Sequence, residues 1–242
     1  MGTSTGYDAP TTPQWSDLKS DITRLARDGK PNTEQSREVI RKYINSNGGS
    51  KNISQGKGVV SSNSAQRTAS KISGFLFDVR QYGFEEALHR LNVKSYKGMN
   101  TLEFTLTLTD FLSESATSLD DADSRNALSR LMEELFNEAA DVEELNSVLE
   151  QKLEEFDIEG ILIKFFSYYL YEQFCRVFYE RLVTRVGDIK AESFLSGIYD
   201  YIISEVHLLN SEDSLTSTDW GSIDLNETSS DILNRTLTIY GG

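Results

Sequence analysis

The chain has 242 residues, 38% of them hydrophobic, which is enough apolar material for one large domain or two small ones. Its 38 acidic and 24 basic residues give a net charge of −14, which argues against high-affinity, sequence-independent binding of nucleic acid, because such binding needs surplus lysine and arginine. A single cysteine excludes an intrachain disulfide and suits a reducing cytoplasm, and we expect neither a signal peptide nor a membrane span.

The N-terminal quarter divides into a polar leader and two helices. Residues 1–14, MGTSTGYDAPTTPQ, bury too little apolar surface to offset their ordering entropy, so we expect a disordered leader. Residues 15–49 are predicted to form a helical pair. The first helix runs from Ser16 to about Arg27, and Thr33 caps the second.

Residues 50–64 are rich in glycine, serine and asparagine, and they are predicted to link this pair to a main helical domain over 65–208. Six basic residues and no acidic one lie between Glu38 and Asp78: Arg41, Lys42, Lys51, Lys57, Arg67 and Lys71. This segment is the one part of the sequence where a contact with nucleic acid or an acidic partner is conceivable. A solubilising linker is the favoured interpretation.

The main domain begins with a helix that Ser64 caps and Gly83 ends. The segment 101–112 is ambiguous. Its leucines and phenylalanine alternate with threonines and a glutamate, as in a strand, but the neighbouring segments are helical and no partner strand is evident. We therefore predict a helix there. Asp120 and Asp121 favour the start of the next helix through the helix dipole.

Charge is distributed unevenly along the chain. Residues 1–117 carry 15 basic and 12 acidic side chains (+3), whereas residues 118–159 carry 3 basic and 14 acidic side chains (−11). A solvated helical face explains such an acidic block most simply, and a basic partner surface is the alternative.

The stretch 158–186 is the most apolar of the chain. Apolar residues recur at helical spacing and cover most of the circumference: Ile161, Phe165, Tyr168, Tyr169, Phe174, Phe178 and Leu182. We expect Asp157 to cap this helix and Gly187 to end it. Charged residues such as Lys164 interrupt it, so it lacks the run needed to span a bilayer.

These patterns predict an all-α fold, a multi-helix bundle around a long central helix at about 158–186. From Leu209 the chain is acidic and rich in serine and threonine, so residues 209–242 are predicted to be a mostly irregular tail.

Chemistry-bearing residues are few. His89 and His207 are too few for most zinc or triad sites, and Cys175 lies among apolar residues, as a buried structural thiol does. The sequence therefore predicts no catalytic residues, no metal site and no cofactor, and hence a protein that is not an enzyme.

Both ends of the sequence offer reactive groups. Removal of Met1 exposes the α-amine of Gly2, a group with an unperturbed pKa of about 7.7–8.0 and no side chain to exclude it from a narrow active site. At the other end, the terminal Gly241-Gly242 is the pattern that ubiquitin-like conjugation enzymes adenylate, although the body lacks their strand pattern.

The opening Met1-Gly2-Thr3-Ser4-Thr5, with Pro10, Pro13 and Trp15 after it, resembles the start of the QatB family, components of the bacterial Qat anti-phage operon. The segment Tyr171-Glu172-Gln173-Phe174-Cys175 is similar to bacterial proteins that share this leader. The resemblance implies operon partners, namely an ATPase, a TatD-like nuclease and a QueC-like enzyme. QueC-like enzymes activate a carboxylate with ATP and pass it to an amine.

The resemblance thus implies a cytoplasmic, non-catalytic defence component whose Gly2 accepts such a transfer, with Thr3, Ser4 and Thr5 bound by the partner. Two alternatives stay open. One is conjugation through Gly242, and the other is a helical adaptor for a nuclease or an ATPase with neither end modified.

Overall fold

The computed structural model describes residues 10–93, 96–113, 115, 117–212 and 225–241. Within these ranges every regular element is a helix, which confirms the all-α prediction. The helices are α1 (Pro13–Arg27), α2 (Thr33–Ser46), α3 (Ser50–Ser54), α4 (Asn63–Tyr82), α5 (Phe84–Arg90), α6 (Thr101–Leu112), α7 (Leu119–Phe136), α8 (Leu145–Val186), α9 (Asp188–Glu212) and α10 (Leu225–Ile239).

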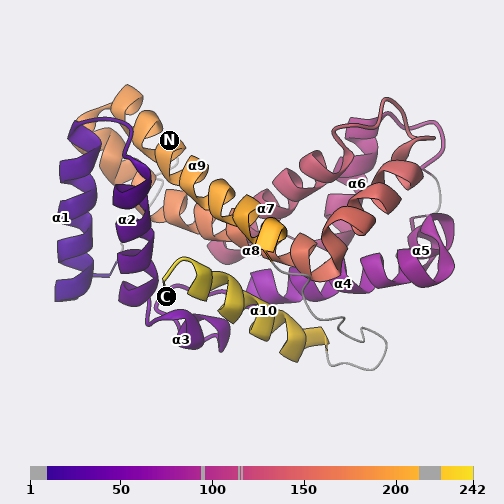
Figure 1. Ribbon diagram of the computed structural model, residues 1–242, viewed down its shortest axis with the longest axis horizontal. Coiled ribbons are helices and arrows are strands. Elements are labelled where there is room, and N and C mark those ends of the chain that lie inside the picture. Colours follow the sequence, from indigo (N-terminus) through magenta and orange to yellow (C-terminus); the bar gives the residue numbers. More distant parts are fainter. Residues whose placement is uncertain (1–9, 94–95, 114, 116, 213–224, 242) are drawn as a thin grey trace.

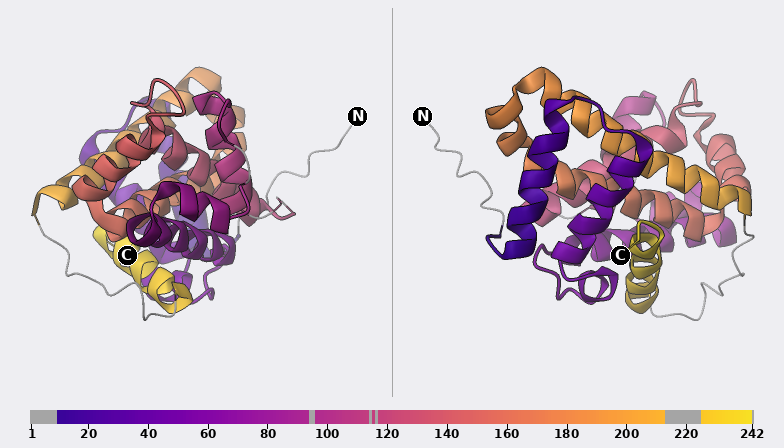
Figure 2. Two further views of the ribbon diagram at one scale, coloured as in Figure 1. Left: turned by 90° about the vertical axis from the view of Figure 1, so that its right-hand side faces the viewer. Right: turned by 60° about the vertical axis from the view of Figure 1, so that its left-hand side comes forward.

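Helix α8 occupies the centre of the fold. It packs most extensively against α7 and α9, and also against α1, α4 and α10. Figure 1 shows α1 and α2 at one end of the molecule and α5 and α6 at the other, with α7, α8 and α9 between them. In the turned views of Figure 2, α1 and α2 form an antiparallel pair beside α9. The predicted central helix is confirmed.

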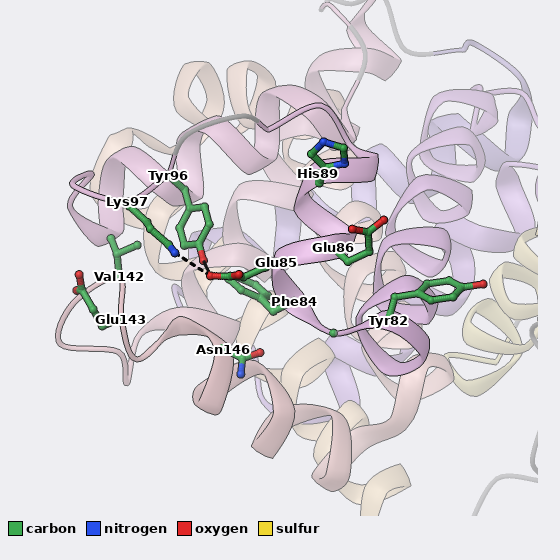
Figure 3. A pocket seen from close by; sticks show the side chains of 11 residues that line it. Tyr82, Phe84, Glu85, Glu86, His89, Tyr96, Lys97, Val142, Glu143 and Asn146 are labelled. Carbon is green, nitrogen blue, oxygen red and sulfur yellow. Dashed lines mark hydrogen bonds and ion pairs between the residues drawn. The ribbon is translucent and has the colours of Figure 1, made fainter.

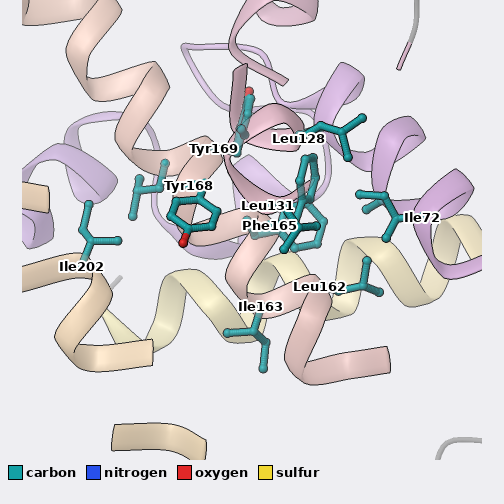
Figure 4. Packing of buried hydrophobic residues seen from close by; sticks show 14 of the residues in the cluster. Ile72, Leu128, Leu131, Leu162, Ile163, Phe165, Tyr168, Tyr169 and Ile202 are labelled. Carbon is teal, nitrogen blue, oxygen red and sulfur yellow. The ribbon is translucent and has the colours of Figure 1, made fainter. Parts of the chain in front are cut away.

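The apolar faces of these helices form one hydrophobic cluster that extends from Trp15 to Tyr240. Figure 4 shows its middle, where Leu162 and Phe165 of α8 lie near Ile72 of α4 and Leu131 of α7. A helix that is apolar around most of its circumference needs cover on most sides, and α8 obtains it from helices that come from every part of the chain.

Asp157 interrupts α8, because its φ of 51° and ψ of −178° are not helical. Its Oδ1 accepts a hydrogen bond from the backbone N–H of Gly160 at 2.8 Å, so the predicted cap at Asp157 is confirmed. Close to this interruption, the carbonyl of Leu153 accepts from the Arg80 guanidinium at 2.7 Å. Gly187 ends α8 with a φ of +83°, as predicted.

The segment 101–112 is helix α6, as predicted. Asn100 begins it with a capping box, because its side chain accepts from the N–H of Glu103 while the Glu103 carboxylate accepts from the N–H of Asn100. Only Phe104, Leu108, Thr109 and Leu112 are buried, at spacings of three and four. The alternation of apolar residues with threonines is typical of a strand, but this segment is a helix with one buried face.

Several predicted boundaries are wrong. Helix α1 starts at Pro13 rather than Ser16, because proline suits the first helical turn. Asn32, not Thr33, caps α2, since its side chain accepts from the N–H of Gln35 while the Gln35 side chain accepts from the N–H of Asn32. Helix α4 starts at Asn63, with Ser62 rather than Ser64 at the N-cap position. The Ser64 hydroxyl is instead committed to Asp121, at 2.8 Å.

The segment 50–64 is packed against the body rather than extended. Its first residues form α3, which packs against α10. Val60 and Ser62 are buried, and the Ser62 hydroxyl donates to the carbonyl of Ile53 at 2.7 Å. The glycine- and serine-rich composition, which is typical of a linker, therefore belongs here to tight turns and to side-chain hydrogen bonds with the backbone.

The prediction of an irregular tail from Leu209 needs correction, because α9 continues to Glu212 and residues 225–239 form α10. Residues 213–224 lie outside the described part. Helix α10 packs against α3, α4 and α8, and Arg235 pairs with the buried Glu159 of α8. Tyr240 is buried, and its hydroxyl lies 2.8 Å from the Ser167 hydroxyl and donates to the Ile202 carbonyl at 3.1 Å. Tertiary contacts, not local propensity, stabilise this helix.

A buried polar cluster joins α2, α4, α7 and α8. The Tyr169 hydroxyl lies 2.6 Å from Asp120 Oδ1 and accepts from the Gln173 amide at 2.9 Å, while the Gln173 oxygen accepts from Tyr43 at 2.8 Å. Asp120 Oδ2 accepts from the Ser61 hydroxyl and from the N–H of Ser64. Each polar group of the cluster has a hydrogen-bond partner within it, which offsets the cost of burying these groups in the core.

We expect Phe178→Ala to lower the free energy of unfolding by about 3–5 kcal/mol, the usual cost of truncating a large core aromatic. Phe178 is fully buried and stacks with Trp15 at 6.2 Å between ring centroids. Tyr179→Ala is the matched control, because Tyr179 is 45% exposed and should cost less than about 1 kcal/mol. Guanidinium denaturation measures both, and equal costs would contradict the burial of Phe178.

We expect Tyr169→Phe to lower the free energy of unfolding by about 1–3 kcal/mol, because it leaves the buried Asp120 Oδ1 without its Tyr169 donor and removes one acceptor of the Gln173 amide. Tyr179→Phe removes the same hydroxyl from an exposed ring and should be nearly neutral. The same denaturation experiment measures the difference. A neutral Tyr169→Phe would show that the cluster contributes nothing to stability.

Candidate functional site

A large, open groove of about 1020 Å³ lies in the described part of the chain. The end of α4, the helix α5, residues 96 and 97, and the turn between α7 and α8 enclose it (Figure 3). This volume lies at the upper limit for small-molecule sites, which occupy roughly 300–1,000 Å³, so the groove has room for a peptide segment.

Gly83 creates the corner at which the groove opens. It ends α4 and starts α5 with a φ of +86° and a ψ of 163°, a conformation that is essentially restricted to glycine. Its N–H donates to the carbonyl of Val79, and its own carbonyl accepts from the N–H of Ala87. The predicted break at Gly83 is confirmed.

Aromatic side chains form the floor of the groove. Phe84 is buried and packs edge to face with Tyr96, at 5.9 Å between ring centroids, and against Phe104 of α6. Tyr82 stands at the rim, where the Arg90 guanidinium lies 3.7 Å from its ring centroid. These contacts hold α5 and residue 96 in fixed positions relative to each other.

The rim of the groove is acidic. Glu85 accepts from Lys97 at 2.9 Å and from the Tyr96 hydroxyl at 3.2 Å, and the Lys97 hydrogen bond lowers the pKa of Glu85 below its ordinary value. Glu86 lies 3.3 Å from Arg90. Glu143, in the turn before α8, is exposed and makes no ion pair with any described residue. Three carboxylates and one lysine thus line the groove.

Asn146, in the first turn of α8, adds a hydrogen-bond acceptor to the same groove. Its amide nitrogen donates to Glu150 at 3.2 Å, but its side-chain oxygen is buried and has no hydrogen-bond partner. A buried acceptor usually has a partner. The carboxylates make the groove complementary in charge to lysine and arginine side chains.

The groove does not hold a catalytic arrangement of the kinds sought in the sequence. His89 lines it but forms no hydrogen bond with the neighbouring carboxylates. Across the described ranges no three histidine, cysteine, aspartate or glutamate side chains are grouped as metal ligands. Burial raises the pKa of Cys175 to about 12, so its thiol stays protonated and is not a nucleophile.

The structure does not describe the predicted site residues. Gly2, Thr3, Ser4 and Thr5 lie outside the described residues, and so does Gly242. The chain is described from Pro10, whose carbonyl accepts from Lys19 at 2.8 Å, and Trp15 then inserts into the core. At the other end, Tyr240 is buried two residues before Gly242.

The basic segment between Glu38 and Asp78 does not form an open basic surface. Arg41 pairs with Glu38 at 2.6 Å, Lys42 with Asp21 at 2.6 Å and Arg67 with Asp121 at 3.6 Å. These partners come from elsewhere in the fold as well as from the segment itself. Acidic residues therefore neutralise much of the charge that the sequence presented as a possible contact for polyanions.

Sequence reasoning missed the groove, because its lining comes from two segments about 50 residues apart and neither contains a motif. The only usable signals were Gly83, which marks a corner, and the acidic block over 118–159, which contributes Glu143.

Residues 48–240 match the protein family described as "Qat anti-phage system associated protein QatB". The match starts at the end of α2 and includes α3 to α10, and hence the groove. No curated protein and no solved structure shows a significant match to the chain. No described helix combines the length and the apolar character needed to cross a bilayer.

Proposed function

This chain belongs to the QatB family of Qat anti-phage system associated proteins, and we propose that it serves there as a non-catalytic substrate protein whose Gly2 amine accepts a group from a QueC-like enzyme. The observation that carries the proposal is the family match, together with a body whose conspicuous groove is a receptor for basic groups rather than a catalytic centre.

The transfer that we propose is an amide-forming reaction. The partner enzyme joins a carboxylate to ATP as an acyl adenylate and releases pyrophosphate. The Gly2 nitrogen then attacks the carbonyl carbon, the amine loses a proton, and AMP leaves. An α-amine with a pKa of about 7.7–8.0 is substantially unprotonated near neutral pH, so no activating base on this chain is required.

The fold supports presentation of the leader from a fixed point. Trp15 is fully buried between Tyr43 and Phe178, and Lys19 holds the carbonyl of Pro10. The residues from Gly2 to Pro10 span at most roughly 25–30 Å when extended. The amine therefore reaches an active site on a partner that is bound to the body within that distance of the start of α1.

Gly242 is the less favoured acceptor. Adenylation of a terminal Gly-Gly requires a tail that enters the active site of the enzyme, whereas Tyr240 is buried and bonded to α8 and α9. We therefore propose Gly2 as the modified residue. Modification at Gly242 is the alternative, which mass spectrometry would detect on the C-terminal peptide.

We expect the protein that is expressed with its operon to carry a mass increase on the N-terminal peptide, and we expect Gly2→Pro to abolish it by replacing the primary amine with a hindered secondary one. Gly2→Ala is the matched control, because it keeps a primary amine on a small residue. Intact-mass and peptide mass spectrometry measure the increase. An unmodified wild-type N-terminus, or a modified C-terminal peptide, would contradict the proposal.

We further propose that the acidic groove binds a basic segment of a partner protein from the operon. The three carboxylates and the unpaired Asn146 oxygen are complementary to lysine and arginine side chains. Binding there supplies affinity, while the leader supplies the reacting amine. Association should weaken as salt rises, because the attraction is between partly exposed charges.

Glu143→Lys should weaken capture of the partner by at least about tenfold, because it places a cation among groups that bind cations. Glu154→Lys makes the same change of charge on an exposed residue of α8 outside the groove and should leave capture intact. Affinity measurements on purified partners would decide this. Equal losses in the two variants would point to net charge rather than to the groove.

A further inference from the structure

A second hollow, of about 290 Å³, lies between α1 and the C-terminal end of α8 and has the opposite charge. Its lining consists of four arginines and two hydroxyl residues: Ser20, Thr23, Arg24, Arg27, Arg181 and Arg185. A concentration of guanidinium groups is unexpected in a chain with a net charge of −14. Elsewhere in the described structure most arginines pair with carboxylates, as Arg125, Arg130 and Arg176 do.

Carboxylates do not neutralise this cluster. Asp21 is 3.4 Å from Arg24, but it makes a shorter ion pair with Lys42, at 2.6 Å. Arg27, Arg181 and Arg185 form no ion pair with any residue that the structure describes. The guanidinium groups of these three residues are therefore available to a ligand.

Arg181 carries the strongest indication that a ligand is missing. Its side chain is half-buried, and its Nε–H is fully buried without an acceptor. Burial and the neighbouring Arg185 lower the pKa of Arg181, which shows that the surroundings disfavour its charge. A buried donor in native structures usually has a partner. An anion in the hollow would provide the compensating charge.

The helix dipoles explain only part of this arrangement. Helix α1 ends at Arg27 and α8 ends at Val186, and cations near helix C-termini are favoured there. That effect accounts for exposed residues such as Arg27 and Arg185. It does not account for the buried, unpaired Nε of Arg181, which is turned away from water.

We propose that this hollow binds the adjacent phosphates of a small ligand, either inorganic pyrophosphate or a nucleoside di- or triphosphate. Guanidinium groups match phosphate oxygens bidentately, and four of them balance the charge of a pyrophosphate group. The Ser20 and Thr23 hydroxyls donate to the carbonyls of Ser16 and Lys19, so the arginines supply the donors.

The size of the hollow distinguishes this ligand from a nucleic acid. A nucleic-acid backbone requires a basic groove that follows several phosphates, whereas this hollow of about 290 Å³ has room for only a few phosphate groups. The chain's net charge of −14 also repels a long polyanion more strongly than a small one.

The test is calorimetric titration of the full-length protein with pyrophosphate, ATP and orthophosphate at about 50 mM salt, where screening is modest. Pyrophosphate and ATP should bind, orthophosphate should bind more weakly, and Arg185→Glu should weaken pyrophosphate binding by at least about tenfold. Arg181→Gln should do the same. Because Arg181 is half-buried, the exposed Arg185→Glu keeps the test valid if Arg181→Gln fails to fold.

Lys51→Glu is the matched control, because it makes the same change of charge on an exposed residue of α3 and should leave binding unchanged. Absence of binding at about 1 mM pyrophosphate, or equal affinity in Arg185→Glu and the wild type, would overturn the proposal. Tighter binding of a single-stranded oligonucleotide of about 20 nucleotides, lost in Arg185→Glu, would also overturn it and assign the hollow to nucleic acid.

Discussion

Residues 158–170 of α8 are buried without interruption, and this continuous burial determines the arrangement of the other helices. A helix covered on every side needs neighbours on every side, so α1, α4, α7, α9 and α10 all pack against it. The chain meets this requirement with helices from both ends of the sequence. Trp15 from the first helix and Tyr240 after the last one therefore belong to one hydrophobic cluster.

Continuous burial also places polar groups of α8 inside the protein, where each one needs a partner. Tyr169 and Gln173 meet this need through Asp120 and Tyr43, and the Ser167 hydroxyl lies beside that of Tyr240. These hydrogen bonds connect α8 with α2, α7 and the end of α10. They join segments far apart in the chain at specific positions, which apolar packing alone does not specify.

The surface presents two hollows of opposite charge on a body without a described catalytic cluster. The groove beside α5 is lined by three carboxylates, of which that of Glu143 forms no ion pair with a described residue. In the hollow beside α1, three of the four guanidinium groups form no ion pair with a described residue. Among the residues that line each one, a buried polar atom has no hydrogen-bond partner in the described structure: Asn146 Oδ1 in the groove and Arg181 Nε in the hollow. That property suits the role that we propose for this member of an anti-phage system, in which the body binds other molecules and the N-terminus is presented to one of them.

The sequence by itself determined the all-α class, the central helix, its cap at Asp157, the break at Gly83 and the burial of Phe178, because periodicity and capping are local properties. Helix α10 was not predictable, since a few apolar residues in an acidic segment become helical only by packing against α3, α4 and α8. Only the tertiary structure could reveal the two hollows. Arg27 and Arg185 of the arginine-lined hollow are distant in the chain, and so are Tyr82 and Glu143 of the groove. Such residues come together only when the segments that carry them pack around α8.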